Sequence, residues 1–283
     1  MYAEKVIDFH IHIGRKEDWH PWVIEYFSKV NPCLFENFKE LMSPDGLEEY
    51  LVEEGVAYAV VLAENSPMTT GVVTNSYVHN FCKGQKRLIP FASINPKTSP
   101  NPDELLEKCV REMGFRGLKL YPTYQHFFPN QKEVYPLYEK AVEFGMPVMF
   151  HTGSSIYRHS KLKYGDPLHL DEVAADFPDL KIVMAHSGRG FWYDRAFFLS
   201  RLHKNLYMEI SGLPPQKLLQ YFPDLEKNAD KVIFGSDWPG IRGIKENIDV
   251  IRALPLKEIT IEKILYRNAE KVLGIQIGLE RKE

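Results

Sequence analysis

The chain has 283 residues, of which 44% are hydrophobic and 26% charged, with a formal net charge of -3. This balance is typical of a globular protein with a large core, and it argues against a nucleic-acid-binding surface. No apolar run approaches the roughly 20 residues of a membrane-spanning helix. The N-terminus shows no signal-peptide pattern, and three scattered cysteines suggest no disulfide framework, so we expect a cytoplasmic protein without a membrane partner.

Short apolar runs and amphipathic stretches alternate along the chain. We predict eight strands, at residues 5–13, 57–64, 87–95, 115–122, 147–151, 181–186, 205–210 and 231–237. Helical spacing with start and stop residues predicts helices at 45–55, 101–114, 133–145, 168–178 and 214–228, and a last helix at 259–274. Strands that alternate with helices indicate parallel βαβ units.

Eight such units fit an α/β fold with a single domain over residues 1–283, a (β/α)8 TIM barrel followed by an extra C-terminal helix. A doubly wound open sheet is the alternative, but no glycine-rich phosphate loop follows the first strand. The connection Gly14–Pro44 is far longer than the usual 2–6 residues and is rich in aromatic residues. It is either a small subdomain or a lid over the barrel mouth.

The first strand, "VIDFHIHIG", carries two histidines in an apolar run. Side chains alternate faces along a strand, so His10 and His12 share one face with Asp8. A solvated edge strand would explain this fragment by itself. The ends of the later strands favour a different interpretation.

Polar residues recur where these strands end. His151 closes "PVMFH", His186 closes "KIVMAH", Asp237 closes "KVIFGSD", and Lys119 lies near the end of "GFRGLKLYP". Catalytic residues of such barrels lie at the C-terminal ends of the strands. Neutral imidazole and carboxylate are ligands that zinc prefers, so the cluster predicts a divalent metal site.

The segments "DFHIHIG", "GFRGLKLYP", "FHTG", "MAHSGRG" and "FGSDWP" together resemble the amidohydrolase superfamily. The resemblance covers nearly the whole chain, and it is closest to the branch that contains aminocarboxymuconate-semialdehyde and resorcylate decarboxylases as well as hydrolases. It implies that His10, His12, His151 and Asp237 bind one divalent metal, zinc or manganese. It also implies that Asp237 handles the proton of a water and that His186 activates this water or binds a second metal.

Lys119 separates the possibilities within this superfamily. Binuclear hydrolases carry a carboxylated, metal-bridging lysine on the fourth strand, whereas the decarboxylases generally lack a lysine there. Beside a cation, Lys119 has to be neutral, carboxylated or turned toward substrate. We predict one metal per chain, with Lys119 unmodified and catalytic beside it, together with Asp237 and His186.

Three functions follow from this set of residues. The first is hydrolysis of an ester, lactone or amide, with a metal lowering the pKa of water to about 7. The second is non-oxidative decarboxylation of a cyclic or unsaturated acid, and the third is sequestration of a metal or ligand without catalysis. A small anionic substrate would suit the cations and aromatic residues of the strand-end loops, namely Arg158, Arg189, Arg242, Tyr121, Tyr124, Phe127, Phe128, Trp192 and Trp238. Related barrels often dimerise, so a homodimer is possible.

Overall fold

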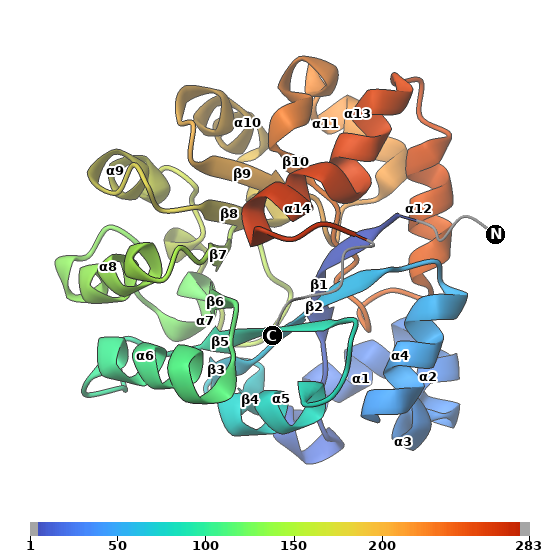
Figure 1. The fold of residues 1–283 in the computed structure, drawn as a ribbon, viewed down its shortest axis with the longest axis horizontal. Coiled ribbons are helices and arrows are strands. Elements are labelled where there is room, and N and C mark those ends of the chain that lie inside the picture. Colours follow the sequence, from blue (N-terminus) through green and yellow to red (C-terminus); the bar gives the residue numbers. More distant parts are fainter. Residues whose placement is uncertain (1–4, 278–283) are drawn as a thin grey trace.

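Eight parallel strands form the centre of the molecule. The computed structural model describes residues 5–277, and its main sheet has the order β1-β2-β5-β6-β7-β8-β9-β10 (Figure 1). The strands are β1 (Ile7–His12), β2 (Tyr58–Leu62), β5 (Leu88–Ser93), β6 (Gly117–Leu120), β7 (Val148–His151), β8 (Ile182–Ala185), β9 (Leu206–Glu209) and β10 (Val232–Ile233). Each falls within one of the eight apolar runs of the sequence.

Hydrogen bonds between the first strand and the end of the last one complete the ring. Phe9 N donates to Phe234 O at 3.0 Å, Asp237 N to His10 O at 3.0 Å, and His12 N to Trp238 O at 2.8 Å. With helices around this ring, the prediction of a TIM barrel is confirmed.

The interior of the barrel is filled by side chains. Phe9 and Phe91 meet edge to face with ring centroids 5.6 Å apart. Gly117 lets the Phe91 ring approach, because a Cβ at this position would lie 2.3 Å from the ring. Both faces of the strands are covered, which explains why they read as nearly continuous apolar runs.

Helices surround the barrel, with their apolar faces toward the strands (Figure 1). They are α4 (Pro44–Glu53), α5 (Asn75–Cys82), α6 (Pro102–Met113), α7 (Pro122–Gln125), α8 (Tyr135–Glu143), α9 (His169–Asp176), α10 (Tyr193–Leu202), α11 (Leu218–Tyr221), α12 (Ile244–Arg252), α13 (Glu258–Glu262) and α14 (Asn268–Leu273). None of the described helices is long and apolar enough to cross a membrane.

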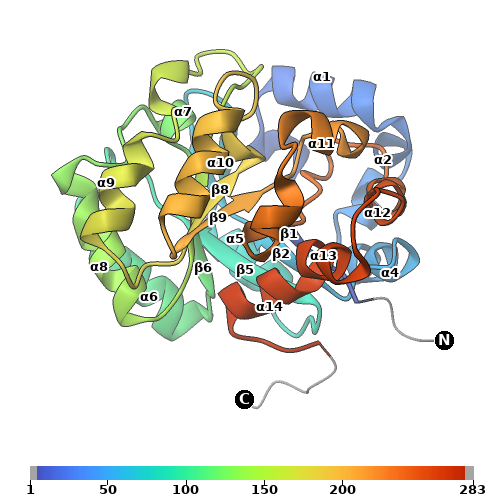
Figure 2. The same ribbon diagram turned by 90° about the horizontal axis from the view of Figure 1, so that it is seen from above.

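Two predicted helices differ in detail from the structure. The stretch 214–228 contains only the short α11 between 3-10 turns, because Pro223 cannot donate the backbone hydrogen bond that a longer helix needs. The last helix is divided into α13 and α14 by a π-helical turn at Lys263–Arg267. In Figure 2, α14 lies at the end of the barrel opposite α7.

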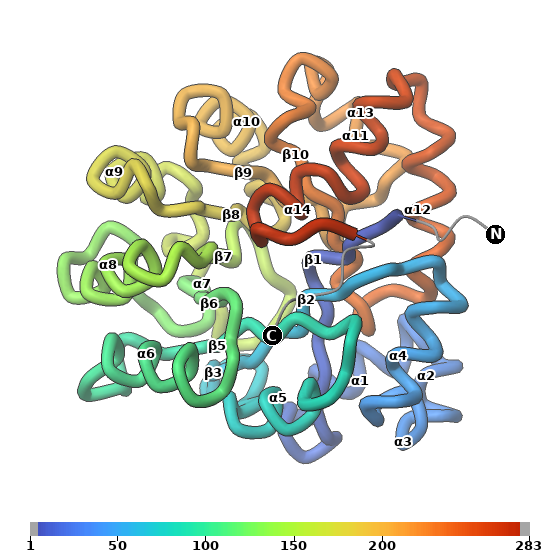
Figure 3. Tube along the Cα trace, viewed as in Figure 1, coloured from blue at the N-terminus to red at the C-terminus, as the bar shows by residue number. Residues whose placement is uncertain are grey.

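The segment Gly14–Pro44 folds into helices of its own. It contains a 3-10 turn (Lys16–Asp18), α1 (Pro21–Val30), α2 (Pro32–Glu36) and α3 (Phe38–Leu41), which Figure 3 traces between β1 and α4. A short hairpin that the sequence did not reveal, β3 (Glu64–Ser66) with β4 (Gly71–Val73), anchors the segment. Trp22 Nε1 donates to Thr69 O at 2.8 Å, and Trp19 pairs with Gly71.

Candidate metal centre

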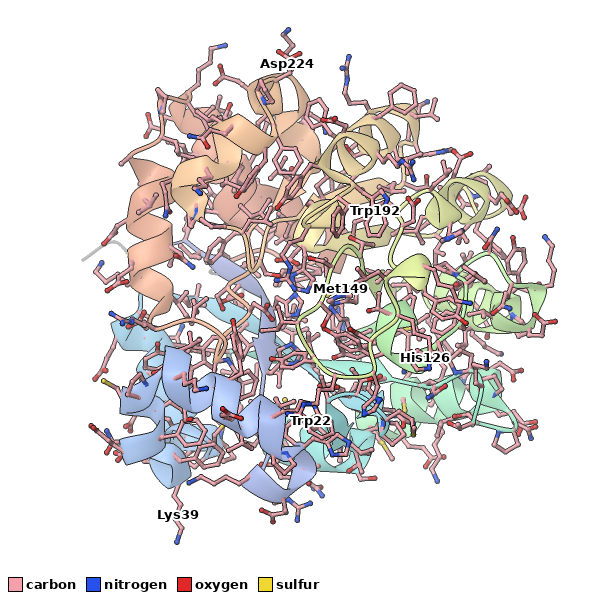
Figure 4. All side chains as sticks on the ribbon, turned by 180° about the vertical axis from the view of Figure 1, so that it is seen from behind. Trp22, Lys39, His126, Met149, Trp192 and Asp224 are labelled. Carbon is pink, nitrogen blue, oxygen red and sulfur yellow. The ribbon has the colours of Figure 1, made fainter. Side chains whose placement is uncertain are left out.

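A cavity of about 240 Å³ opens at the C-terminal end of the barrel. Its polar lining residues are His10, His12, Glu64, Thr70, Ser154, Ser155, His151, His186, Arg189 and Asp237. Its aromatic and aliphatic lining residues are Trp19, Val23, Tyr26, Phe27, Tyr121, Tyr124, Ile156 and Tyr157. In Figure 4, Met149 of β7 is labelled near the middle of the molecule, and Trp22 of α1 is labelled below it.

Three donor atoms from the two ends of the chain converge in this cavity. His10 Nε2 lies 3.2 Å from His12 Nε2 and 3.5 Å from Asp237 Oδ1, and His12 Nε2 lies 3.4 Å from the same oxygen. Ligand atoms bound tetrahedrally at zinc distances lie about 3.4 Å apart. The spacing of these three atoms therefore fits a divalent metal.

His151 adds a candidate donor on the opposite side of the ring of strands. It is 2% exposed, and its buried Nε2 has no hydrogen-bond partner among residues 5–277. Its ring centroid lies 4.7 Å from that of His186. Burial lowers the pKa of both imidazoles well below 6.5, with the positive charge of Arg189 adding to the effect. Both rings are therefore neutral at neutral pH, which is the form that binds a metal.

His186 is also near the candidate metal donors. Ligand atoms of His10, His186 and Asp237 all lie within 4.8 Å of one another, and His186 Nδ1 is 3.9 Å from Asp237 Oδ2. The geometry thus allows His186 either as a ligand or, as we predicted, as a group beside the metal. The structure brings all the predicted ligand and catalytic residues to one end of the barrel.

Two of these residues adopt a left-handed backbone. His186 has φ 63° and Asp237 has φ 67°, a conformation that is unfavourable for residues with a Cβ. The hydrogen bond from Asp237 N to His10 O holds the aspartate turn against β1. Strained backbone of this kind concentrates at functional sites.

Lys119, near the end of β6, is fully buried. Its Nζ lies 3.2 Å from Met149 Sδ and 5.1 Å from the centre of the Tyr121 ring. Burial lowers the pKa of Lys119 to about 8, while the negative charges of Glu209 and Asp237 oppose this shift. Lys119 is not among the described residues that line the cavity, but its positive charge is close enough to lower the pKa of His10 further, beyond the larger effect of burial.

Two buried carboxyl groups complete the site, and our sequence interpretation missed both. Glu209 ends β9 and is 0% exposed, and its Oε2 lies 3.1 Å from His10 Nδ1. Glu64 is 3% exposed, lines the cavity, and accepts a hydrogen bond from the Thr70 hydroxyl. Burial raises the pKa of both carboxyl groups, while the positive charge of Lys119 opposes this shift at Glu209. Glu64 ends a predicted strand, and Glu209 is the next-to-last residue of another, so both lie where the signal that identified His151 and Asp237 was read.

The loop residues that we expected to contact substrate divide into two groups. Tyr121, Tyr124 and Arg189 line the cavity, and Arg189 Nη1 lies 3.8 Å from Asp237 Oδ2. Six others are not among the described residues that line it, namely Phe127, Phe128, Arg158, Trp192, Trp238 and Arg242. Of these, Trp238 and Phe127 are buried in the core, and Arg158 lies against the Trp22 ring. Local sequence could not show which loop side chains fold back into the core.

The Gly14–Pro44 segment contributes four side chains to the cavity wall, those of Trp19, Val23, Tyr26 and Phe27. Tyr26 meets Tyr157 of the loop after β7 edge to face, with centroids 5.8 Å apart. The segment therefore has buried residues of its own and also covers part of the cavity. That it opens and closes as a lid stays a prediction.

A family model described as Amidohydrolase matches residues 7–275. The chain belongs to this family. It is 33% identical over 166 residues to the 2-keto-4-carboxy-3-hexenedioate hydratase of Sphingobium sp., a match that spans 49% of this chain and about half (48%) of the hydratase. It is 20% identical over 284 residues to the gamma-resorcylate decarboxylase of Polaromonas sp., covering 83% of this chain and 86% of that protein.

Solved structures share the fold of this amidohydrolase. A TIM-barrel protein of Bordetella bronchiseptica superposes with a TM-score of 0.79 at 24% identity, over 95% of this chain and 98% of that one. The manganese-bound dihydroxybenzoic acid decarboxylase of Polaromonas sp. gives 0.72 at 17% identity, over 96% and 97%. A probable 2-pyrone-4,6-dicarboxylic acid hydrolase of Acinetobacter baumannii gives 0.65 at 16%, over 96% and 100%.

Proposed function

We propose that this amidohydrolase is a metal-dependent hydrolase that cleaves an ester, lactone or amide bond of a small carboxylate. The observation that carries the proposal is the position of Asp237. Its Oδ1 converges with two imidazole Nε2 atoms, while its Oδ2 faces His186 and Arg189 in the cavity. One carboxylate can thus serve as a metal ligand and as a base toward a bound water.

The residues that would hold the metal are His10, His12 and Asp237, with His151 as the fourth candidate. The mutual distances of the first three support this assignment, as does the Nε2 of His151, which has no hydrogen-bond partner in the described part of the chain. Zinc or manganese, at one ion per chain, would act as a Lewis acid toward a substrate oxygen and would make water more acidic.

The remaining roles follow from charge and exposure. The Asp237 side chain is 24% exposed, so its Oδ2 can accept a proton from water and return it to the leaving group. Arg189 would bind the substrate carboxylate, because a guanidinium pairs with carboxylates through two parallel hydrogen bonds. Lys119, unmodified and buried, would act on the site through its charge.

Decarboxylation is the second candidate, and the shape of the cavity supports it. Tyr26, Tyr121, Tyr124 and Tyr157 give the cavity an aromatic wall, which suits a flat, cyclic or unsaturated acid. The relative that matches 83% of this chain is a decarboxylase. In this reaction His186 or Asp237 would protonate the substrate carbon.

One experiment distinguishes these reactions. The metal-loaded protein is incubated in water enriched in ¹⁸O with a panel of aryl and alkenyl carboxylates, with and without ester, lactone or amide groups. Hydrolysis places ¹⁸O in the product without gas release, whereas decarboxylation releases carbon dioxide and leaves ¹⁸O out of the organic product. Asp237→Asn serves as the inactive control. Tight metal binding with no turnover of the panel would contradict both reactions and favour sequestration.

A further inference from the structure

Glu209 and Ser211 lie directly behind two of the site histidines. They are 0% and 1% exposed, and they come from the end of β9 and the residues just after it. Ser211 N donates to Glu209 Oε1 at 2.7 Å, and the Ser211 hydroxyl donates to Glu209 Oε2 at 2.8 Å. The two side chains therefore form a fixed unit at the bottom of the site.

This unit contacts the same nitrogen of both rings. His10 Nδ1 lies 3.1 Å from Glu209 Oε2 and 3.0 Å from Ser211 Oγ. His186 Nδ1 lies 3.0 Å from Ser211 Oγ and 3.0 Å from the Ser211 carbonyl oxygen. One serine hydroxyl thus bridges a candidate metal ligand and a candidate catalytic group.

Hydrogen-bond accounting determines where the hydrogens lie. A carbonyl oxygen only accepts, so the contact with Ser211 O requires a hydrogen on His186 Nδ1. Both oxygens of Glu209 accept hydrogen bonds from Ser211, and the positive charge of buried Lys119 favours the ionised carboxylate. A carboxylate only accepts, so His10 Nδ1 also carries a hydrogen. The Ser211 hydroxyl gives its hydrogen to Glu209 and keeps two lone pairs, one for each Nδ1–H. Every donor then has an acceptor.

We propose that Glu209 and Ser211 are positioning residues that hold His10 and His186 in one tautomer, with hydrogen on Nδ1 and a free lone pair on Nε2. For His10 this lone pair is on the atom that approaches His12 and Asp237. Partners of this kind fix the ring orientation and raise the basicity of a ligating histidine. The consequence for metal binding rests on the proposed function, whereas the tautomers themselves do not.

The local backbone makes room for this arrangement. At Gly235 on β10's continuation, a Cβ would lie 2.1 Å from Glu209 Oε1 and 2.9 Å from His10 Cβ. A side chain there would push the carboxylate away from the imidazole. Glycine at this position is therefore part of the same unit.

The first test uses the metal-free full-length protein, labelled with ¹⁵N in its histidines, at pH 7.5. Long-range ¹⁵N–¹H spectra distinguish the two neutral tautomers, and His10→Asn and His186→Asn assign the signals. We expect both rings with hydrogen on Nδ1. Hydrogen on Nε2 of either ring would overturn the proposal, and this result needs neither substrate nor a Glu209 variant.

The second test compares two Glu→Gln variants. Glu209→Gln replaces an acceptor oxygen with an amide group, so we expect a changed His10 signal and Zn²⁺ affinity reduced about 10–100-fold in chelator competition. Glu64→Gln makes the same change at a residue that is also buried but has no hydrogen bond to either ring in the described structure, and we expect it to keep both tautomers. Unchanged affinity and spectrum in a folded Glu209→Gln protein would also overturn the proposal. A catalytically inactive protein with both tautomers as expected would instead count against the proposed function.

Discussion

Gly212→Ala offers a sharp test of Arg189 as the substrate anchor. Gly212 has φ +65°, and a Cβ there would lie 2.3 Å from Arg189 Nη1 and 3.1 Å from Asp237 Oδ2. The guanidinium is the flexible end of a side chain, so it is the group that would move. The substitution therefore displaces Arg189 from the cavity wall without removing a charge.

The expected cost has two parts. A left-handed backbone costs an alanine about 1–2 kcal/mol of stability, or about 2–8 °C in Tm. Losing a hydrogen bond to a charged group costs about 1.5–3 kcal/mol, so KM for the anionic substrate should rise at least about tenfold. The metal content should stay at the wild-type level, because the contacts of Asp237 Oδ1 are on the other side of the carboxylate.

Gly114→Ala is the matched control. Gly114 has φ +71° at the end of α6, and a Cβ there would meet nothing within 4 Å. It should show the loss of Tm without a change in KM. The assay is steady-state kinetics with the substrate found in the ¹⁸O panel, together with thermal unfolding and metal analysis. If Gly212→Ala had the KM of Gly114→Ala, the assignment of Arg189 would be refuted.

Four further predictions test the rest of the site. His12→Ala should lose metal and activity but keep its fold, since His12 is not part of the apolar core; full occupancy by metal analysis would contradict the ligand set. Removing the metal with a chelator should abolish activity, and Zn²⁺ or Mn²⁺ should restore it; activity that persisted at zero metal content would argue against a metal enzyme. Lys119→Met should lower turnover sharply at a metal count near one, whereas a wild-type count near two that falls in this variant would indicate a carbamate bridge. Limited proteolysis within residues 14–44 should slow when substrate binds, and equal rates with and without it would count against a lid.

The sequence predicted the barrel well because its signals are local. A strand covered on both faces is a short apolar run, and eight such runs alternating with amphipathic helices leave few folds possible. The hairpin β3–β4 was missed because Glu64–Ser66 and Gly71–Val73 are too short to show a period. Where Pro223 interrupts the pattern, the predicted long helix became α11 and 3-10 turns.

The candidate site was predicted in part for the same reason. Residues that end strands are visible in the sequence, so the His10, His12, His151, His186 and Asp237 cluster could be predicted from the parallel arrangement alone. Glu209 also lies at the end of a strand, β9. Its role beside the site depends on the short distance to His10 Nδ1, and only the folded chain shows this distance. Phe127 and Trp238 were expected to contact substrate but are buried in the core. The sequence does not show whether an aromatic residue of a loop faces a cavity or the core.

The hydrogen bonds that close the barrel also have a consequence for how the enzyme becomes active. Asp237 N binds His10 O, and His12 N binds Trp238 O, so the contacts that join the first and last strands also bring the metal donors together. These residues stand near opposite ends of the chain, and pairing them requires the closure of a very long loop. During synthesis, a ribosome-bound chain that has not yet exposed its eighth strand would present His10 and His12 without their carboxylate. The metal centre thus forms late in folding, and chains that lack the last strand should be inactive.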